Sequence, residues 1–178
     1  MSEQNEEVKI LKWILGQAYR ANRRKAQLDR RLEMIRAECD SPMRAVSYDF
    51  TPGSKGQVSE GASGIVIKMS EIEERITEQK KNVDKAIIRT MDIIDYLPEE
   101  TLEREICELR HIDMMPWKDI QKETSMSRSQ CFKRHKSAIG MLLERERVRK
   151  MVEDSREAYI EYMMQRVWDW HNRSKKAK

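Results

Sequence analysis

The chain has 178 residues, of which 37% are charged and 6% are aromatic, with six glycines, four prolines and a net charge of +4. This composition predicts an all-α protein of long, solvent-exposed helices rather than a large globular core. No apolar run approaches the ~18–20 residues that span a bilayer. The acidic N-terminus lacks the apolar region of a signal peptide, so we expect a soluble, cytoplasmic protein without membrane contact.

The first 64 residues divide into a helix and a linker. Apolar residues recur in steps of three and four from Ile14 to Ile35, which predicts one unbroken amphipathic helix over residues 6–38 of the N-terminal segment 1–39. Residues 40–64 contain two of the prolines and four of the glycines among Ser, Thr and Gln. That segment is therefore expected to be a flexible linker.

Residues 65–97 have the pattern of a long coiled-coil-like helix. Apolar positions follow alternating three–four spacing across four heptads, weakened by Gln79 and Thr90. The apolar stripe must be covered, and the spacing allows packing on the first helix or on a second copy of the chain. We therefore expect a homodimer through this helix or through residues 144–172 as one arrangement, and an intramolecular hairpin as the other.

Acidic and basic residues are segregated along the chain. Residues 71–108 hold twelve acids and six bases, a net charge of −6. Residues 109–150 hold eleven bases and five acids, a net charge of +6. This distribution favours binding of a polyanion on the basic part only.

Residues 98–143 carry a helix-turn-helix pattern. Pro98 suits the first position of a core helix. The first helix of the motif is predicted from Trp117 to Thr124, and after a three-residue turn Ser127 is the N-cap of a second helix. The spacing places one set of residues in a small inner core: Leu109, Ile112, Trp117, Ile120, Met126, Cys131, Ala138, Ile139 and Leu142.

The outer side of the second helix presents side chains that suit DNA. Gln bonds adenine and Arg or Lys bonds guanine in the major groove, mostly from the N-terminal part of a recognition helix. The base-contacting candidates are Ser129, Gln130, Lys133 and Arg134. The phosphate-contacting candidates are Lys118, Ser127, Arg128 and Lys136. The alternative interpretation of this pattern is a solvated basic helix pair in a helical protein.

Residues 144–178 are predicted to be a helical extension with a basic tail. A nearly continuous helix is expected from Arg128 to about Asn172, because this stretch has no proline. Trp168 and Trp170 suit anchors onto another surface, either the core of this chain or a partner.

Chemistry of other kinds is not indicated. The three cysteines are far apart and form no CxxC pair, and the three histidines lack metal-ligand spacing. The paired glutamates Glu73/Glu74 and Glu99/Glu100 lie in exposed helical contexts without a pocket pattern. We expect no catalytic residue, no metal, no cofactor, and thiols that are small buried side chains.

The stretch from Leu109 to Ile139 resembles region 4 of sigma factors. It is closer still to the sigma-like regulators encoded by phages and prophages of Gram-positive bacteria, the RinA/ArpU type, whose last helix contains Arg-x-His-x-x-Ala-Leu. Lys133-Arg-His-Lys-Ser-Ala-Ile139 follows that element, and the resemblance covers about residues 10–143. The chain departs from the pattern where the family usually has Gly, Ser/Thr, Ala, Leu and Gly, because it has Met114, Pro116, Gln121, Thr124 and Ser125.

The resemblance implies binding of promoter DNA and control of late phage genes such as those for packaging and morphogenesis. It also implies contact with host RNA polymerase. We therefore expect a sequence-specific transcriptional regulator, an activator, that reads double-stranded DNA with helix 128–142. The alternatives are a phage small-terminase-like DNA-packaging component and a helical interaction scaffold.

Overall fold

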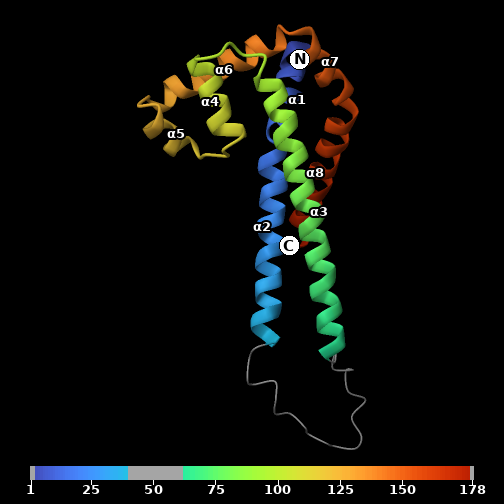
Figure 1. Ribbon diagram of the computed structural model, residues 1–178. Helices are drawn as coiled ribbons and strands as arrows, with labels where there is room; N and C mark the ends of the chain where they lie inside the picture. Colours follow the sequence, from blue (N-terminus) through green and yellow to red (C-terminus); the bar gives the residue numbers. More distant parts are fainter. Residues whose placement is uncertain (1–2, 40–61, 177–178) are drawn as a thin grey trace, which may run out of the picture. The chain divides into compact units, whose positions relative to one another are not determined.

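The computed structural model describes residues 3–39 and 62–176. These residues form eight α-helices and, within the two described ranges, no strand (Figure 1), which confirms the all-α class. The helices pack into two compact units. One unit combines Met1–Tyr19 with Asp84–Lys178, and the other is Arg20–Val83.

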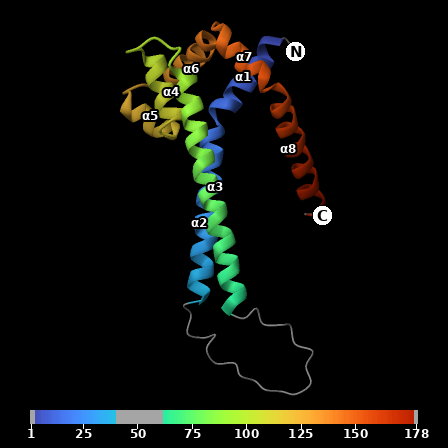
Figure 2. The same ribbon diagram turned by 45° about the vertical axis from the view of Figure 1, so that its right-hand side comes forward.

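The unit Arg20–Val83 is a helical hairpin. It contains most of α2 (Gln17–Cys39) and the N-terminal part of α3 (Ala62–Ile94), which lie side by side in Figures 1 and 2. Because α3 begins at Ala62, the last three residues of the predicted linker are helical. Residues 40–61, the rest of that prediction, lie outside the described residues.

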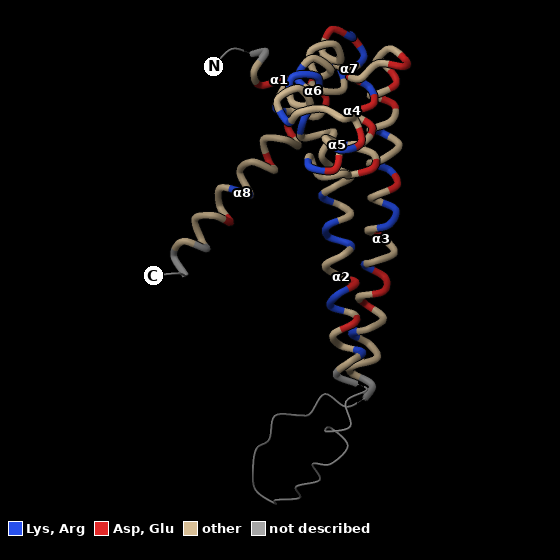
Figure 3. Tube along the Cα trace, turned by 90° about the vertical axis from the view of Figure 1, so that its left-hand side faces the viewer, with Lys and Arg blue, Asp and Glu red and all other residues tan. Residues whose placement is uncertain are grey.

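Apolar burial and one ion pair hold this hairpin together. Leu32 of α2 and Ile76 of α3 are both buried. Arg36 Nη2 donates to Glu73 Oε1 at 2.7 Å, between two half-exposed side chains. Charged positions lie along both helices (Figure 3), mostly basic on α2 and of both signs on α3, as expected for surfaces in water. The hairpin is one of the two arrangements that the stripe of residues 65–97 allowed.

The predicted unbroken helix over residues 6–38 is two helices. Helix α1 (Glu3–Leu15) ends at Gly16, whose N–H donates to the Lys12 carbonyl at 3.1 Å, and α2 starts at the next residue. Glycine is about 1 kcal/mol less favourable than alanine inside a helix, so this position is where the helix breaks at least cost. The apolar side of α1 is buried almost completely, with Ile10, Leu11, Ile14 and Leu15 at 0–1% exposure.

The larger unit has an extensive apolar core built from five helices. They are α1, the end of α3, α4 (Leu102–His111), α6 (Arg128–Leu143) and α7 (Glu146–Asp154). Full burial of one aliphatic side chain contributes about 1.5–3 kcal/mol. The core therefore ties α6 to helices outside residues 98–143. Its buried members are Ile10, Leu11, Ile14, Leu15, Ile93, Ile94, Leu97, Cys107, Ala138, Ile139, Leu142, Val148 and Val152.

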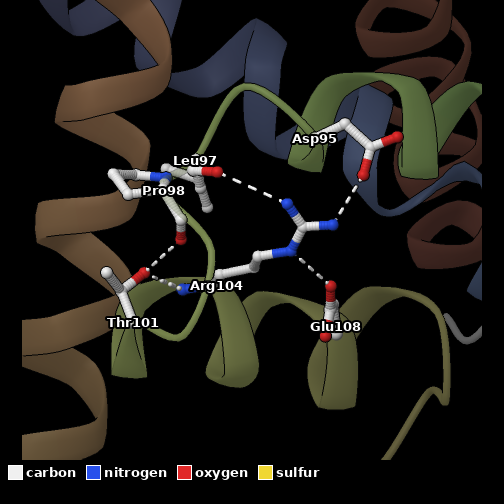
Figure 4. Close-up of polar contacts among 6 residues, drawn as sticks. All are labelled: Asp95, Leu97, Pro98, Thr101, Arg104 and Glu108. Carbon is white, nitrogen blue, oxygen red and sulfur yellow. Dashed lines mark hydrogen bonds and ion pairs between the residues drawn. The ribbon is translucent and has the colours of Figure 1, made fainter.

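A polar network fixes the corner between α3 and α4 (Figure 4). Arg104 donates from Nε to Glu108 Oε1 at 2.8 Å and from Nη2 to Asp95 Oδ1 at 2.7 Å. The hydroxyl of Thr101 accepts the Arg104 N–H at 3.3 Å, which makes Thr101 the N-cap of α4. The prediction of Pro98 as the first helical residue is therefore wrong, because the capping hydroxyl lies three residues later.

The predicted continuous C-terminal helix is three helices. Helix α6 ends at Leu143, and Arg145 is the N-cap of α7. Ser155 separates α7 from α8 (Arg156–Lys176), and its hydroxyl accepts from Arg89 Nη2 at 2.8 Å and donates to the Met151 carbonyl at 2.7 Å. Because the chain breaks before and after α7, the buried residues Val148 and Val152 of this helix lie in the core. No helix in the described parts of the chain is long and apolar enough to cross a membrane.

Candidate nucleic-acid interface

Helices α5 (Trp117–Glu123) and α6 are joined by a short, hydrogen-bonded turn. The Met126 N–H donates to the Gln121 carbonyl at 3.1 Å, and Ser125 has a positive φ of 53°. Ser127 is the N-cap of α6, as predicted. Its hydroxyl accepts the Gln130 N–H at 3.3 Å, and Gln130 Oε1 accepts the Ser127 N–H at 2.9 Å. This reciprocal capping box gives α6 a defined start.

The predicted inner core of the motif is divided between two clusters. A small cluster lies between α4, α5 and the first part of α6 and buries Ile106, Ile120 and Cys131. Three other predicted members, Leu109, Trp117 and Met126, pack against this cluster. The remaining four, Ile112, Ala138, Ile139 and Leu142, lie in or against the large core. The inner core predicted for the motif did not include Ile106 and Met115, which also belong to the small cluster. The prediction of one core was wrong because α6 is long enough, at about 24 Å, to pack on different helices at its two ends.

The outward side of α6 is polar and cationic. Ser129, Lys133 and Lys136 are exposed, and helical spacing places Lys133 near the middle of this face. Gly140 lies on the same side, and no atom would come within 4 Å of an added Cβ there. Within the described part of the chain, neither Lys133 nor Lys136 has a carboxylate at ion-pairing distance. Lys133 and Lys136 therefore add positive charge to this face, and Glu103, paired with Arg134, is the acid at its edge.

Two arginines flank this face. On one side Arg134 Nη1 donates to Glu103 Oε1 of α4 at 2.9 Å. On the other side Arg128 lies over the Phe132 ring at 5.5 Å from its centroid, and Phe132 packs on Trp117 with centroids 4.4 Å apart. Phe132, at 40% exposure, was missed by the sequence analysis. Both arginines are thus oriented by neighbouring side chains rather than extended into solvent.

The capping box restricts what Gln130 and Ser127 offer to a ligand. Gln130 Oε1 accepts from the Ser127 backbone, which holds the amide in the cap and leaves its NH₂ group free of that bond. A bidentate contact to adenine needs both the oxygen and the nitrogen. The hydroxyl of Ser127 already accepts one bond and retains its proton, which suits donation to a phosphate. Lys118 is exposed on α5, as its predicted phosphate role requires.

A buried histidine pair lies beneath this surface. His111 of α4 and His135 of α6 are hydrogen-bonded through their Nε2 atoms at 2.9 Å. The Leu15 backbone, at the end of α1, also forms a hydrogen bond with His111. Burial is the main cause that lowers the pKa of His111 to about 3 and that of His135 to about 4. Neighbouring positive charge, including Arg110 for both and Lys12 for His135, contributes to these values. Both imidazoles are therefore neutral at pH 7.

Sequence reasoning had no signal for this pair, because the two histidines are 24 residues apart and lie on different helices. Cys107 and Cys131 are buried free thiols, as predicted, and burial raises the pKa of Cys107 to about 12. No group of three or more His, Cys, Asp or Glu side chains among the described residues is arranged to hold a metal ion.

Comparison of the chain with models of known protein families, with curated proteins and with solved structures finds no match.

Proposed function

We propose that this chain is a sequence-specific DNA-binding transcriptional regulator that places α6 in the major groove. The observation that carries this proposal is the exposed face of α6, where Lys133 and Lys136 form no ion pair with any described residue. The opposite side of α6 is buried, so only this face is available to a ligand. A helix with one buried and one cationic face suits the groove and phosphates of a duplex.

The geometry divides the roles among the candidate residues. Lys133, at the middle of the face, and Ser129, near its start, are the best placed to reach base edges. Gln130 donates through its amide group to an acceptor such as guanine O6 or thymine O4, because the bond from the Ser127 N–H holds its oxygen towards the cap. Arg134 reaches the duplex from the α4 side while Glu103 orients it. The proposed phosphate contacts are Lys118, Ser127, Arg128 and Lys136.

Backbone conformation supports the proposed kinship with the sigma-like phage regulators. At two positions where that pattern usually has glycine, the chain has Met114 and Ser125. Both adopt positive φ, 57° and 53°, and Glu100 is the one further non-glycine residue in the described ranges that does so. Glycine is the residue that adopts this conformation at least cost. Positive φ at Met114 and Ser125 is the conformation that glycine at these two positions would favour.

From this kinship we propose activation of late phage or prophage genes, with host RNA polymerase as a partner. The test is capture of the tagged protein on chromatin, together with transcript levels in the presence and absence of the gene. The proposal predicts occupancy at one or a few promoters whose transcripts fall on deletion. Occupancy spread evenly over the genome, or none, would overturn it.

A DNA-packaging component is the second candidate, because α8 exposes a large apolar face that suits subunit assembly. Such a component would form a ring of many subunits. The mass of the purified protein separates the two functions, since a monomer or dimer supports regulation and a large ring supports packaging.

A further inference from the structure

One side of helix α2 is a row of arginines. At 3.6 residues per turn, five positions of this helix fall within an arc of about 120°. The row is about 16 Å long, at about 1.5 Å per residue, and Figure 3 shows the run of basic positions along α2. This arginine row consists of Arg20, Arg23, Arg24, Arg30 and Arg31, and all of these except Arg20 are exposed.

The acids of α2 do not lie beside the row. This helix holds seven bases and three acids. Helical spacing places Asp29 and Glu33 on the far side of the helix from the arc, and Asp29 forms an ion pair with Lys25 at 2.7 Å. The third acid, Glu38, comes seven residues after the last arginine, at a distance of about 10 Å along the axis. The charge of the row is therefore opposed only at its end within α2.

The second helix of the hairpin does not neutralise the row either. Residues 62–83 of α3 hold four bases and four acids. The acid Glu73 pairs with Arg36, which lies outside the arc. Arg30 donates to the Ala26 carbonyl of its own helix at 3.2 Å, and the four exposed arginines form no ion pair with a described residue. Their charge is available to an anion from solution.

Residue type and shape favour the phosphate backbone of a duplex as that anion. Every base in the row is arginine, whose planar guanidinium donates two parallel N–H bonds to phosphate oxygens. The one lysine of α2, Lys25, lies outside the arc. Gln27 lies between the arginines within the arc and adds an amide donor of the kind that contacts phosphate. An extended row matches a duplex, which carries one negative charge per ~1.7 Å of its axis.

A lipid surface suits this helix less well. A helix that lies on a membrane inserts its own apolar side between the headgroups. The apolar side of α2 is used in the hairpin, where Leu32 of α2 and Ile76 of α3 are both buried. The arc itself contains one exposed large apolar residue, Met34. The row therefore offers charge without the apolar surface that membrane binding requires.

We propose that the arginine row is a second DNA contact, which holds the phosphate backbone of a duplex without reading its sequence. The choice of DNA as the polyanion rests on the proposed function, whereas the geometry of the row is independent of α6. In this arrangement α6 supplies the preference for one site, and the row supplies affinity that is common to all duplexes.

The test removes three charges of the row from the full chain, as Arg23→Gln, Arg24→Gln and Arg31→Gln together. Fluorescence anisotropy measures binding to an unselected DNA duplex across a range of salt concentrations. The slope of log affinity against log salt concentration should fall by about 2–3, because each phosphate contact contributes about 0.9. Affinity for a selected site should fall by the same factor as affinity for the unselected duplex.

The matched control removes three exposed bases from α3 of the same hairpin, as Arg75→Gln, Lys80→Gln and Lys81→Gln together. It changes the net charge equally but lies outside the row, so the slope should stay that of the wild type. Gln has nearly the helix propensity of Arg and Lys, so helical circular dichroism should be unchanged in both variants. Equal slopes in the two variants would show an effect of net charge alone and would overturn the proposal.

Two further ligands test the choice of anion. The triple α2 variant is compared with the wild type on duplex RNA and on vesicles that contain phosphatidylserine. A loss of binding to either of these, with the DNA slope unchanged, would assign the row to that ligand and overturn DNA as its partner. A lower DNA slope with wild-type binding to the vesicles is the expected result.

The row and α6 can fail separately. If Lys133→Ala removes the preference for the selected site while the α2 variant keeps the wild-type slope, the row is not a DNA contact and reading by α6 stands. If the α2 variant lowers the slope while Lys133→Ala leaves the preference unchanged, the row contact stands and base reading by Lys133 is wrong.

Discussion

Glu103 of α4 and Arg134 of α6 form an ion pair at the edge of the cationic face, with Arg134 Nη1 2.9 Å from Glu103 Oε1. The carboxylate is 13% exposed and the guanidinium side chain 50% exposed. Glu103 therefore both orients Arg134 and lowers the positive potential next to the proposed duplex site. A carboxylate so placed opposes non-specific attraction to phosphate more than it opposes base contacts.

We predict that Glu103→Gln raises affinity for random-sequence duplex about threefold at low salt, because one negative charge is removed beside the face. The preference for the specific site over random duplex should fall, since Arg134 is no longer held in one orientation. Fluorescence anisotropy with labelled duplexes measures both quantities. Glu105→Gln is the control, because Glu105 is exposed on the same helix and has no ion pair to α6 among the described residues. Equal effects of the two variants would show that Glu103 has no special role.

From the histidine pair we predict that acid begins to destabilise the fold at a higher pH than the pH range in which carboxylates titrate. The folded pKa values, about 3 for His111 and about 4 for His135, lie below the ~6.5 of an unfolded histidine. Above pH 6.5 both states are neutral, so stability does not depend on these groups. As pH falls from 6.5 towards 4, the unfolded chain binds protons that the folded chain does not, and the free energy of unfolding decreases.

We expect a loss on the order of 2 kcal/mol per histidine between pH 6.5 and pH 5, measured by urea denaturation. Replacing both residues, His111→Gln with His135→Gln, should lower stability at pH 7 and flatten this pH dependence. His171→Gln is the matched control, because His171 is exposed on α8 and the slope should stay that of the wild type. The same slope in the double variant would contradict the assignment.

The turn before α6 predicts a stabilising substitution. Ser125 has a φ of 53°, a left-handed conformation that costs a residue with a Cβ about 1–2 kcal/mol. Ser125→Gly should raise the free energy of unfolding by about 0.5–1 kcal/mol, after the greater freedom of glycine in the unfolded chain is subtracted. Ser129→Gly, in the first turn of α6, should have the opposite sign. Chemical denaturation measures both variants, and destabilisation by Ser125→Gly would contradict the strain argument.

The turn and the start of α6 could be predicted because their signals are local. Pro116 precedes the first helix, and Ser127 with Gln130 forms a capping box within four residues. The breaks at Gly16 and Ser155 could not be predicted with the same security. A single glycine is tolerated in many helices, and Ser155 acts as a break through a hydrogen bond from Arg89, which is 66 residues away in the chain.

For α6 too, the sequence predicted the local pattern of exposed and buried residues but not all of its long-range contacts. Alternation along α6 correctly placed Lys133 and Lys136 on the outer side and Cys131 and Ala138 on the inner side. It predicted that Leu109 and Ile112 pack on the inner side, but not that α1, α3 and α7 also cover it, because those contacts depend on tertiary packing. The partners of α6 include α1, more than 100 residues away, and its edge contact to Glu103 lies 31 residues away.

The most direct test of DNA reading by α6 compares three chains on two duplexes. A site selected from a random pool by the wild-type chain, and an unselected duplex, are titrated across a range of salt concentrations. Lys133→Ala should weaken binding to the selected site about tenfold more than to the unselected duplex. Lys150→Ala, which removes an exposed lysine from α7, should leave this preference unchanged. A wild-type chain that binds neither duplex at low salt, or equal losses for Lys133→Ala on both, would contradict base reading by this helix.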